Sequence, residues 1–296
     1  MTIETLSNPE RTPMNSAREH HLAERDGFPR TVAANGLDIY VDRVGEGPDV
    51  LLIGGLGDTV ESWQFQLDGL ADRYRMTAFD NRGEGRTPLP EGPVKVQEMA
   101  DDAAAVLEAL EISSAHVAGF SGGSLIAQEL ALRHPELVRS LVLQSTWARV
   151  DPYGARELEF WRWLIETAPN ERAFLEWFFL WIYTPRAHND GTVDAFIDDV
   201  LAFPHKQPAE NLVRLLDAYA RDDRSDRLVQ IGAPTLVLAG GRDLNARPEL
   251  GRVVAELIPS ARFEVMEEEA HQPFQEVSDR WNARVDAFWR EVEARA

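Results

Sequence analysis

The chain has 296 residues and no cysteine, an absence that excludes disulfides, thiolate metal sites and cysteine nucleophiles. A chain without cysteine fits a reducing compartment, so we expect a cytoplasmic protein. Long apolar runs are lacking as well. No run of about 18 apolar residues occurs, so no membrane-spanning helix is predicted. Residues 1–28 hold no apolar segment of the kind found in secretory signals, and we interpret them as a polar N-terminal arm.

Positive charge is scarce, because 30 Lys and Arg residues stand against 50 Asp and Glu residues and give a formal net charge of -20. So acidic a surface repels phosphate backbones and anionic lipids. We therefore expect neither nucleic acid nor a membrane as a partner. The expected partner is a small-molecule substrate, and a homodimer stays open. With 44% hydrophobic and 27% charged residues, the composition is that of a soluble globular protein.

Short apolar runs alternate with amphipathic helical patterns along most of the chain. The runs cover residues 37–44, 49–53, 76–79, 115–119, 141–144, 235–239 and 262–266, and the helical patterns cover residues 96–110, 122–134, 248–257 and 279–292. Continuously apolar strands that alternate with helices indicate parallel pairing under helices on both faces. The predicted fold class is α/β, with a doubly wound, mostly parallel sheet.

Residues 147–230 interrupt this alternation, because their pattern is helical and contains no convincing buried strand. They hold 14 of the 26 aromatic residues of the chain. We predict an inserted helical cap at 147–230, between core segments at 29–146 and 231–296. The aromatic residues either form the core of the cap or line an apolar substrate pocket. Trp147 and Trp181 are the candidates in the cap for binding substrate, together with Phe120 in the core.

The sequence Gly119-Phe120-Ser121-Gly122-Gly123 contains the pattern G-x-S-x-G between a predicted strand and a predicted helix. In that setting the pattern is typical of a sharp turn that exposes a nucleophilic serine, here Ser121. Glycines two residues before and after the serine leave room for the turn. The serine hydroxyl then lies at a helix N-terminus, where negative charge is favoured. The alternative is an ordinary strand–turn–helix connection.

A serine hydroxyl needs an adjacent base, and that base needs an orienting acid. Asp243 follows the run at 235–239, and His271 follows the run at 262–266. Both positions are at carboxyl ends of predicted strands, where an open α/β sheet gathers its site. Each residue has a plainer alternative, since Asp243 could cap a helix and His271 could be a solvated loop residue. The three glutamates at 267–269 could suggest a metal site with His271, but no further ligand completes it, and we predict no metal.

Together these features resemble the α/β-hydrolase superfamily from about residue 31 to the C-terminus. The marks are the glycine cluster GGLG after a strand, the segment DNRGEGRT, the serine turn, the segment GGRD and the His271 loop. The resemblance implies a Ser121–His271–Asp243 triad, an oxyanion hole formed by the backbone N–H groups of Leu56 and Gly122, and no cofactor. Many relatives have His-Gly where this chain has Gly-Gly. The string GGLGDTVESW is similar to that of 3-oxoadipate enol-lactonases and of cofactor-free esterases.

We predict a serine hydrolase that cleaves a carboxylic ester or lactone of a largely apolar small molecule through an acyl-enzyme. A serine at position 121 argues against epoxide hydrolases and haloalkane dehalogenases, which use aspartate there. The alternatives are a carbon–carbon bond hydrolase or a perhydrolase with the same triad, and a non-catalytic binding protein with this fold. A basic group in the pocket, such as Arg149, Arg186 or His188, would favour an acidic lactone, whereas an apolar pocket would favour a neutral ester.

Overall fold

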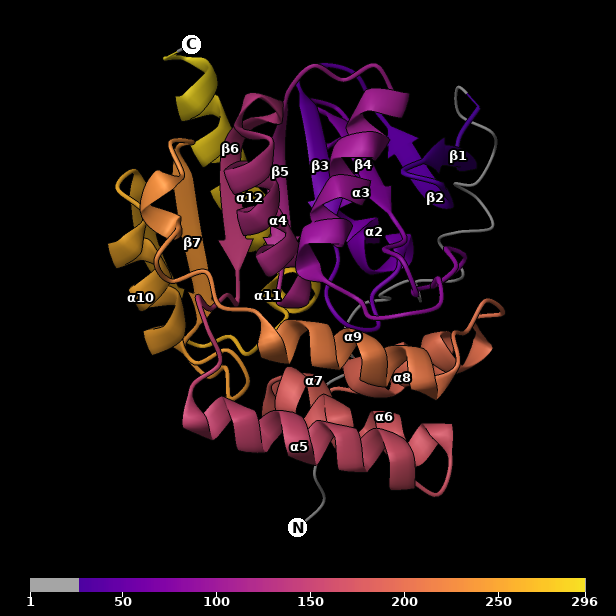
Figure 1. The fold of residues 1–296 in the computed structure, drawn as a ribbon. Helices are drawn as coiled ribbons and strands as arrows, with labels where there is room; N and C mark the ends of the chain where they lie inside the picture. Colours follow the sequence, from indigo (N-terminus) through magenta and orange to yellow (C-terminus); the bar gives the residue numbers. More distant parts are fainter. Residues whose placement is uncertain (1–26, 296) are drawn as a thin grey trace.

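The computed structural model describes residues 27–295, and its strands form one eight-stranded sheet (Figure 1). The strand order is β1-β2-β4-β3-β5-β6-β7-β8. β2 is antiparallel to β1 and β4, and all other neighbours are parallel. The predicted fold class is therefore confirmed. The strands are β1 (Arg30–Ala34), β2 (Leu37–Val44), β3 (Asp49–Ile53), β4 (Arg75–Phe79), β5 (Ala115–Phe120), β6 (Val138–Gln144), β7 (Thr235–Gly240) and β8 (Ala261–Met266).

Both faces of the central strands are covered by helices, so their side chains alternate between two hydrophobic clusters. In β3, Leu51 and Ile53 belong to one cluster, whereas Val50 and Leu52 belong to the other. This is the two-residue period of a strand that is buried on both sides. The first face carries α3 (Val96–Ala109), α4 (Gly122–Arg133) and α10 (Pro248–Leu257). The second carries α2 (Gln64–Leu70), α11 (Pro273–Glu276) and α12 (Ser278–Glu293).

Between β6 and β7 the chain forms a layer of helices at the carboxyl ends of the parallel strands, below the sheet in Figure 1. We call residues 152–221 the cap. Its helices are α5 (Pro152–Thr167), α6 (Glu171–Ile182), α7 (Pro185–Asn189), α8 (Thr192–Ala202) and α9 (Ala209–Arg221). Asp151, Asn170 and Thr184 cap the first three helices by accepting a backbone N–H. The predicted boundaries at 147 and 230, as limits of an independent unit, stay a prediction.

The N-terminal end of the core differs from the sequence-based expectation. Residues 1–26 of the predicted arm lie outside the described residues. Phe28 is only 7% exposed and belongs to a core cluster, with the guanidinium of Arg30 4.6 Å from its ring. The arm therefore ends before residue 28, and β1 is a strand that the sequence reading missed. Within residues 27–295, no helix has the length and apolar character needed to cross a bilayer.

Candidate active site

The turn between β5 and α4 holds Ser121 in a backbone conformation that non-glycine residues rarely adopt. Its φ is 50° and its ψ is -121°. The flanking glycines are required by close backbone approach. A Cβ on Gly119 would lie 2.5 Å from the carbonyl oxygen of Gly123, and a Cβ on Gly123 would lie 2.2 Å from that of Ile53. The strained serine is thus held at the N-terminus of α4, where backbone N–H groups lack partners within the helix.

The structure brings the three predicted catalytic side chains together although they come from three separate loops. The Ser121 Oγ lies 3.0 Å from His271 Nε2, and His271 Nδ1 lies 2.8 Å from Asp243 Oδ2. Asp243 and His271 are each 3% exposed. The edge of the Phe120 ring packs on the imidazole with ring centroids 4.9 Å apart. This arrangement suits a serine that transfers its proton to a histidine oriented by a carboxylate.

Backbone contacts fix the positions of the acid and the base. The second carboxylate oxygen of Asp243 accepts hydrogen bonds from the backbone N–H groups of Asn245 and Ala246, both at 2.9 Å. The backbone N–H of His271 donates to the carbonyl of Ile182 at the end of α6, at 3.0 Å. Its carbonyl accepts from the Ser145 hydroxyl at 2.9 Å. The imidazole is therefore positioned partly by the sheet and partly by the cap.

The loop after β3 is braced on both sides of Leu56, whose N–H is the predicted oxyanion donor. The N–H of Gly55 donates to Asp58, and the N–H of Gly57 donates to Glu84, each at 2.8 Å. Both carboxyl groups are buried, and burial raises the pKa of each. Neither acceptor is a histidine of the kind that many relatives carry at this loop. In this chain, Asp58 and Glu84 hold the loop after β3, which has Gly54-Gly55 where many relatives have His-Gly.

Tyr219 of α9 covers the other predicted oxyanion donor, Gly122. A Cβ on Gly122 would lie 2.6 Å from atoms of the Tyr219 ring, so this position requires glycine. The Tyr219 hydroxyl is buried and has no hydrogen-bond partner among the described residues. Burial raises the pKa of Tyr219 well above its ordinary value, which keeps the phenol neutral. The cap thus contacts the helix N-terminus directly.

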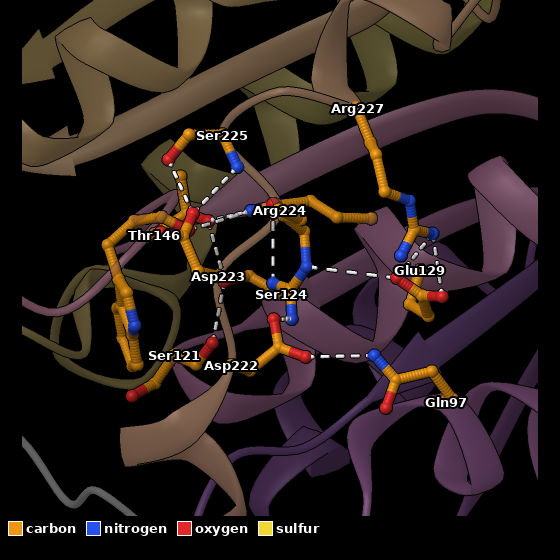
Figure 2. Close-up of polar contacts among 12 residues, drawn as sticks. Gln97, Ser121, Ser124, Glu129, Thr146, Asp222, Asp223, Arg224, Ser225 and Arg227 are labelled. Atoms are coloured by element: carbon orange, nitrogen blue, oxygen red, sulfur yellow. Dashed lines mark hydrogen bonds and ion pairs between the residues drawn. The ribbon is translucent and has the colours of Figure 1, made fainter.

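A buried polar network extends from the serine turn toward Arg224 (Figure 2). The Ser124 hydroxyl is 2.6 Å from the Ser121 carbonyl and 2.7 Å from the Thr146 hydroxyl. Gln128 donates to the same threonine at 2.6 Å. Gln128 in turn lies 3.4 Å from Arg224, which follows the last cap helix. The turn and the exit of the cap therefore share one hydrogen-bonded network.

Arg224 anchors the chain where it leaves the cap. Its side chain is 1% exposed and forms an ion pair with Asp222, while its Nε lies 3.9 Å from Glu129 of α4. Glu129 also accepts two hydrogen bonds from Arg227, at 2.8 and 2.9 Å. Gln97 of α3 donates to Asp222 at 3.0 Å (Figure 2). These pairs satisfy charges that would otherwise be costly to bury.

Two adjoining cavities lie between the cap and the sheet. The small cavity, of about 90 Å³, is lined by Ser121 and His271. The large cavity, of about 480 Å³, is lined by neither of them but by aromatic side chains of α6 and α8 and by the loop after β3. Four residues line both cavities and so separate them: Leu56, Trp161, Phe178 and Gln272. A mostly apolar wall therefore divides a small chamber at the catalytic side chains from a larger one.

Comparison with known proteins identifies this architecture. The family described as the alpha/beta hydrolase fold matches residues 48–276. The chain belongs to the α/β-hydrolase family. The predicted resemblance to that superfamily is confirmed, and hydrolases are found among the relatives.

Two sequence relatives and one solved structure show the range of this α/β-hydrolase family. A protein of Azorhizobium caulinodans with the provisional name carbamate hydrolase RutD is 32% identical, and the match covers 86% of this chain and 96% of that protein. A Mycobacterium tuberculosis protein with the provisional name non-heme bromoperoxidase BpoC is 33% identical, covering 87% and 100%. The enol-lactonase of Burkholderia xenovorans has a TM-score of 0.77 at 23% identity, covering 88% and 99%, which shows the fold alone.

The residues predicted to bind substrate are divided between the cavity and the cap of this α/β-hydrolase. Phe120 and Trp147 line the small cavity. Trp181 lines neither of the two cavities, which departs from the prediction. It packs within the cap against Phe160 and Trp161, with ring centroids 5.7 and 5.4 Å apart. Trp181 therefore belongs to the core of the cap, which is the other role considered for the aromatic residues of this segment.

The three basic residues considered for the pocket, Arg149, Arg186 and His188, do not all line a cavity. Arg186 forms ion pairs with Glu269 and Glu276 at 2.9 and 3.4 Å, and the imidazole of His188 contacts the Phe179 carbonyl. Neither lines the two cavities. Arg149 does line the small cavity, but it is an exposed residue.

Several polar groups around the site escaped the sequence reading. Asp58 and Glu84 stand in the strings GGLGDT and DNRGEGR, and nothing in these strings marks the two acids as acceptors for the loop after β3. Glu157 and Tyr219 come from cap helices and line the small cavity, and no local motif marks either one. Only the packing of the cap onto the sheet brings these two residues to the serine.

Proposed function

We propose that the protein is a serine hydrolase that cleaves a carboxylic ester or a lactone in a small, largely apolar molecule. The observation that carries the proposal is the hydrogen-bonded series from Ser121 through His271 to Asp243, which borders a cavity at a helix N-terminus. A triad of this geometry supports acyl transfer. The apolar lining of both cavities supports an apolar substrate.

In the proposed reaction, Ser121 attacks the acyl carbon while His271 Nε2 takes the hydroxyl proton. The histidine then gives that proton to the leaving alcohol, and an acyl-enzyme remains. Water attacks the acyl-enzyme by the same route in reverse, which releases the acid. Asp243 keeps the His271 Nδ1 proton in place and stabilises the imidazolium.

The backbone N–H groups of Leu56 and Gly122 would bind the negative oxygen of the tetrahedral intermediate. The braced loop at Leu56 supports this role, because Asp58 and Glu84 hold its two neighbours. Donors that are fixed before the reaction need no reorganisation, and one such donor is worth about 3 kcal/mol of barrier. Arg186 and His188 are engaged outside the two cavities, but Arg149 lines the small cavity and His205 and Lys206 line the large one, so both a neutral ester and an acidic lactone stay candidates.

A fluorophosphonate probe followed by a substrate panel tests the proposal. The wild-type protein and Ser260→Ala, an exposed serine, should be labelled, whereas Ser121→Ala should not. The panel compares p-nitrophenyl esters, lactones, a phenyl carbamate and a carbon–carbon cleavage substrate. The carbamate is included because one relative bears the name of a carbamate hydrolase. A folded wild-type protein that neither reacts with the probe nor cleaves any ester or lactone contradicts the proposal.

A further inference from the structure

The small cavity contains a carboxyl group that the proposed reaction does not use. Glu157 of α5 lines this cavity together with Ser121 and His271, and it is 9% exposed. Its Oε1 atom is buried and has no hydrogen-bond partner within residues 27–295. A buried acceptor without a partner destabilises the folded protein. A chain retains such a group at a cavity most readily where a bound molecule supplies the missing donor.

The surroundings of Glu157 are mostly apolar. The other residues that line the small cavity include Val150, Leu158, Leu216 and Leu250. The pKa of Glu157 is raised to about 7, with burial as the largest cause. The charge of Asp243 also contributes to the rise, whereas the charges of His271 and Arg247 and a hydrogen bond with Trp161 oppose it. The carboxyl is therefore a group that bound molecules can shift between its neutral and ionised forms near neutral pH.

Two basic residues lie near Glu157, and the Nη1 atom of one of them, Arg247, is buried without a hydrogen-bond partner within residues 27–295. Arg247 forms an ion pair with Asp151 at 2.5 Å, and its guanidinium lies 4.4 Å from the centre of the Tyr153 ring. Arg149 lines the cavity as an exposed residue. Neither arginine is hydrogen-bonded to Glu157 in the structure. A cation or N–H donor inside the cavity would therefore meet the Oε1 atom of Glu157, which has no hydrogen-bond partner within residues 27–295.

We propose that Glu157 is a specificity-determining residue that accepts a hydrogen bond from an N–H group of the substrate, with an amine as the best donor. The inference rests on the proposed function, because it concerns the molecule that Ser121 attacks. A cavity of about 90 Å³ corresponds to about three water-sized groups. The donor must therefore belong to a short group, within a few atoms of the scissile carbonyl. The large cavity then holds the apolar remainder of the substrate.

The experiment compares two esters of equal size. In p-nitrophenyl 3-aminopropanoate an ammonium group replaces the terminal methyl of p-nitrophenyl butanoate. We expect the wild-type kcat/KM to favour the amino ester by about tenfold or more, since a site that hydrogen-bonds a donor rejects the analogue without it. In Glu157→Gln the preference should fall to about threefold or less, and in Glu157→Leu it should reverse. Rates for Ser121→Ala give the background.

Glu159→Gln is the matched control, because Glu159 is an exposed glutamate on the same helix. Its preference should equal that of the wild type. Two results overturn the inference: an unchanged preference in both Glu157 variants, or equal losses on both esters, which would assign Glu157 a role in supporting His271 or the fold. Urea unfolding of each variant separates loss of fold from loss of selectivity.

A pH series sharpens the test. The titration of His271 affects kcat/KM for both esters equally, so its effect cancels in the ratio of the two kcat/KM values. As Glu157 ionises with rising pH, the ratio for the wild type should increase between pH 6 and pH 8, within the range set by a pKa of about 7. The charged groups that act on this carboxyl are His271, Asp243 and Arg247, and Arg149, Asp151 and Tyr219 line the same cavity. A ratio that is flat in the wild type across this range counts against the inference.

Labelling separates this inference from the proposed function. Fluorophosphonates that carry a 3-aminopropyl or a butyl group report on the same contact without turnover. Faster labelling of the wild type, but not of Glu157→Gln, by the amino probe supports the role of Glu157. Equal labelling by both probes overturns that role and leaves the hydrolase proposal standing. Failure of both probes to react overturns the proposed function and this inference with it.

Discussion

Two groups of serine, histidine and carboxylate occupy opposite ends of β5. At the carboxyl end, Ser121, His271 and Asp243 form the candidate triad. At the other end, the imidazole of His116 lies 2.7 Å from the Ser140 hydroxyl and 3.0 Å from a Glu293 oxygen. The same three types of side chain therefore meet twice, at similar distances.

The surroundings of the two groups differ. Ser140 and His116 are fully buried, Ser140 is in the middle of β6, and neither residue lines the two cavities described above. Ser121 instead stands at a helix N-terminus beside a cavity. A serine, a histidine and a carboxylate in contact are therefore not sufficient to make the serine a nucleophile. An open space for the acyl group and backbone donors for its oxygen are required as well.

The largest expected effect is on the two serines. Ser121→Ala should lower kcat on a p-nitrophenyl ester by about 10⁵-fold or more, because the nucleophile is lost. Ser140→Ala should leave kcat within about threefold and lower the free energy of unfolding by about 1–3 kcal/mol, because His116 loses a buried partner. Steady-state kinetics and urea unfolding measure both. A large loss of kcat in Ser140→Ala would remove the distinction between the two groups.

The carboxylates of the two groups, Asp243 and Glu293, should also differ in their effect on kcat. Asp243→Asn should lower kcat by about 10³-fold to 10⁴-fold, because the amide holds His271 in the wrong tautomer. Glu293→Gln should leave kcat unchanged and change the unfolding free energy by less than about 1 kcal/mol, since Glu293 is 34% exposed. Both substitutions are close to isosteric. Equal effects on kcat would contradict the assignment of the acid.

The largest loss of stability is expected from a substitution in the polar network around Arg224. Arg224→Met keeps much of the volume but leaves the buried carboxylate of Asp222 without its arginine and leaves Glu129 with Arg227 alone. We expect a loss of about 3–5 kcal/mol in the free energy of unfolding. Arg221→Met, at an exposed arginine nearby on α9, is the control and should cost less than about 1 kcal/mol. Similar unfolding curves for both variants would show that the network does not bear on stability.

The smallest expected effect concerns pH. Burial lowers the pKa of His116 to about 4, although Glu293 opposes the shift. The folded-state pKa is then below the unfolded value of about 6.5, so the unfolded chain binds the proton first as pH falls. The free energy of unfolding therefore keeps its full value, as far as His116 is concerned, above about pH 6.5. It falls by up to about 3 kcal/mol as the pH is lowered toward 4. Urea unfolding of His116→Gln should lack this part of the pH dependence, and an unchanged slope would contradict it.

The sequence predicts the sheet and the triad because both depend on local patterns. Buried strands are continuously apolar, and the turn at Ser121 needs glycines at fixed positions. β1 was missed because three of its five residues are exposed, which leaves little hydrophobic signal. Glu157 and Tyr219 could not be predicted because their roles arise from how the cap lies on the sheet. Trp181 was misjudged for the same reason, since an aromatic residue that packs in the cap has the same sequence signal as one that faces a pocket.

The hydrogen bond from the His271 backbone to the Ile182 carbonyl links the cap to the histidine loop. A chimera that grafts the cap of another hydrolase onto this sheet must therefore present a carbonyl at the same point. Without it the histidine loses one of the contacts that hold it. Replacement of the cap as a module would then alter reaction rates even for substrates that never touch the grafted helices.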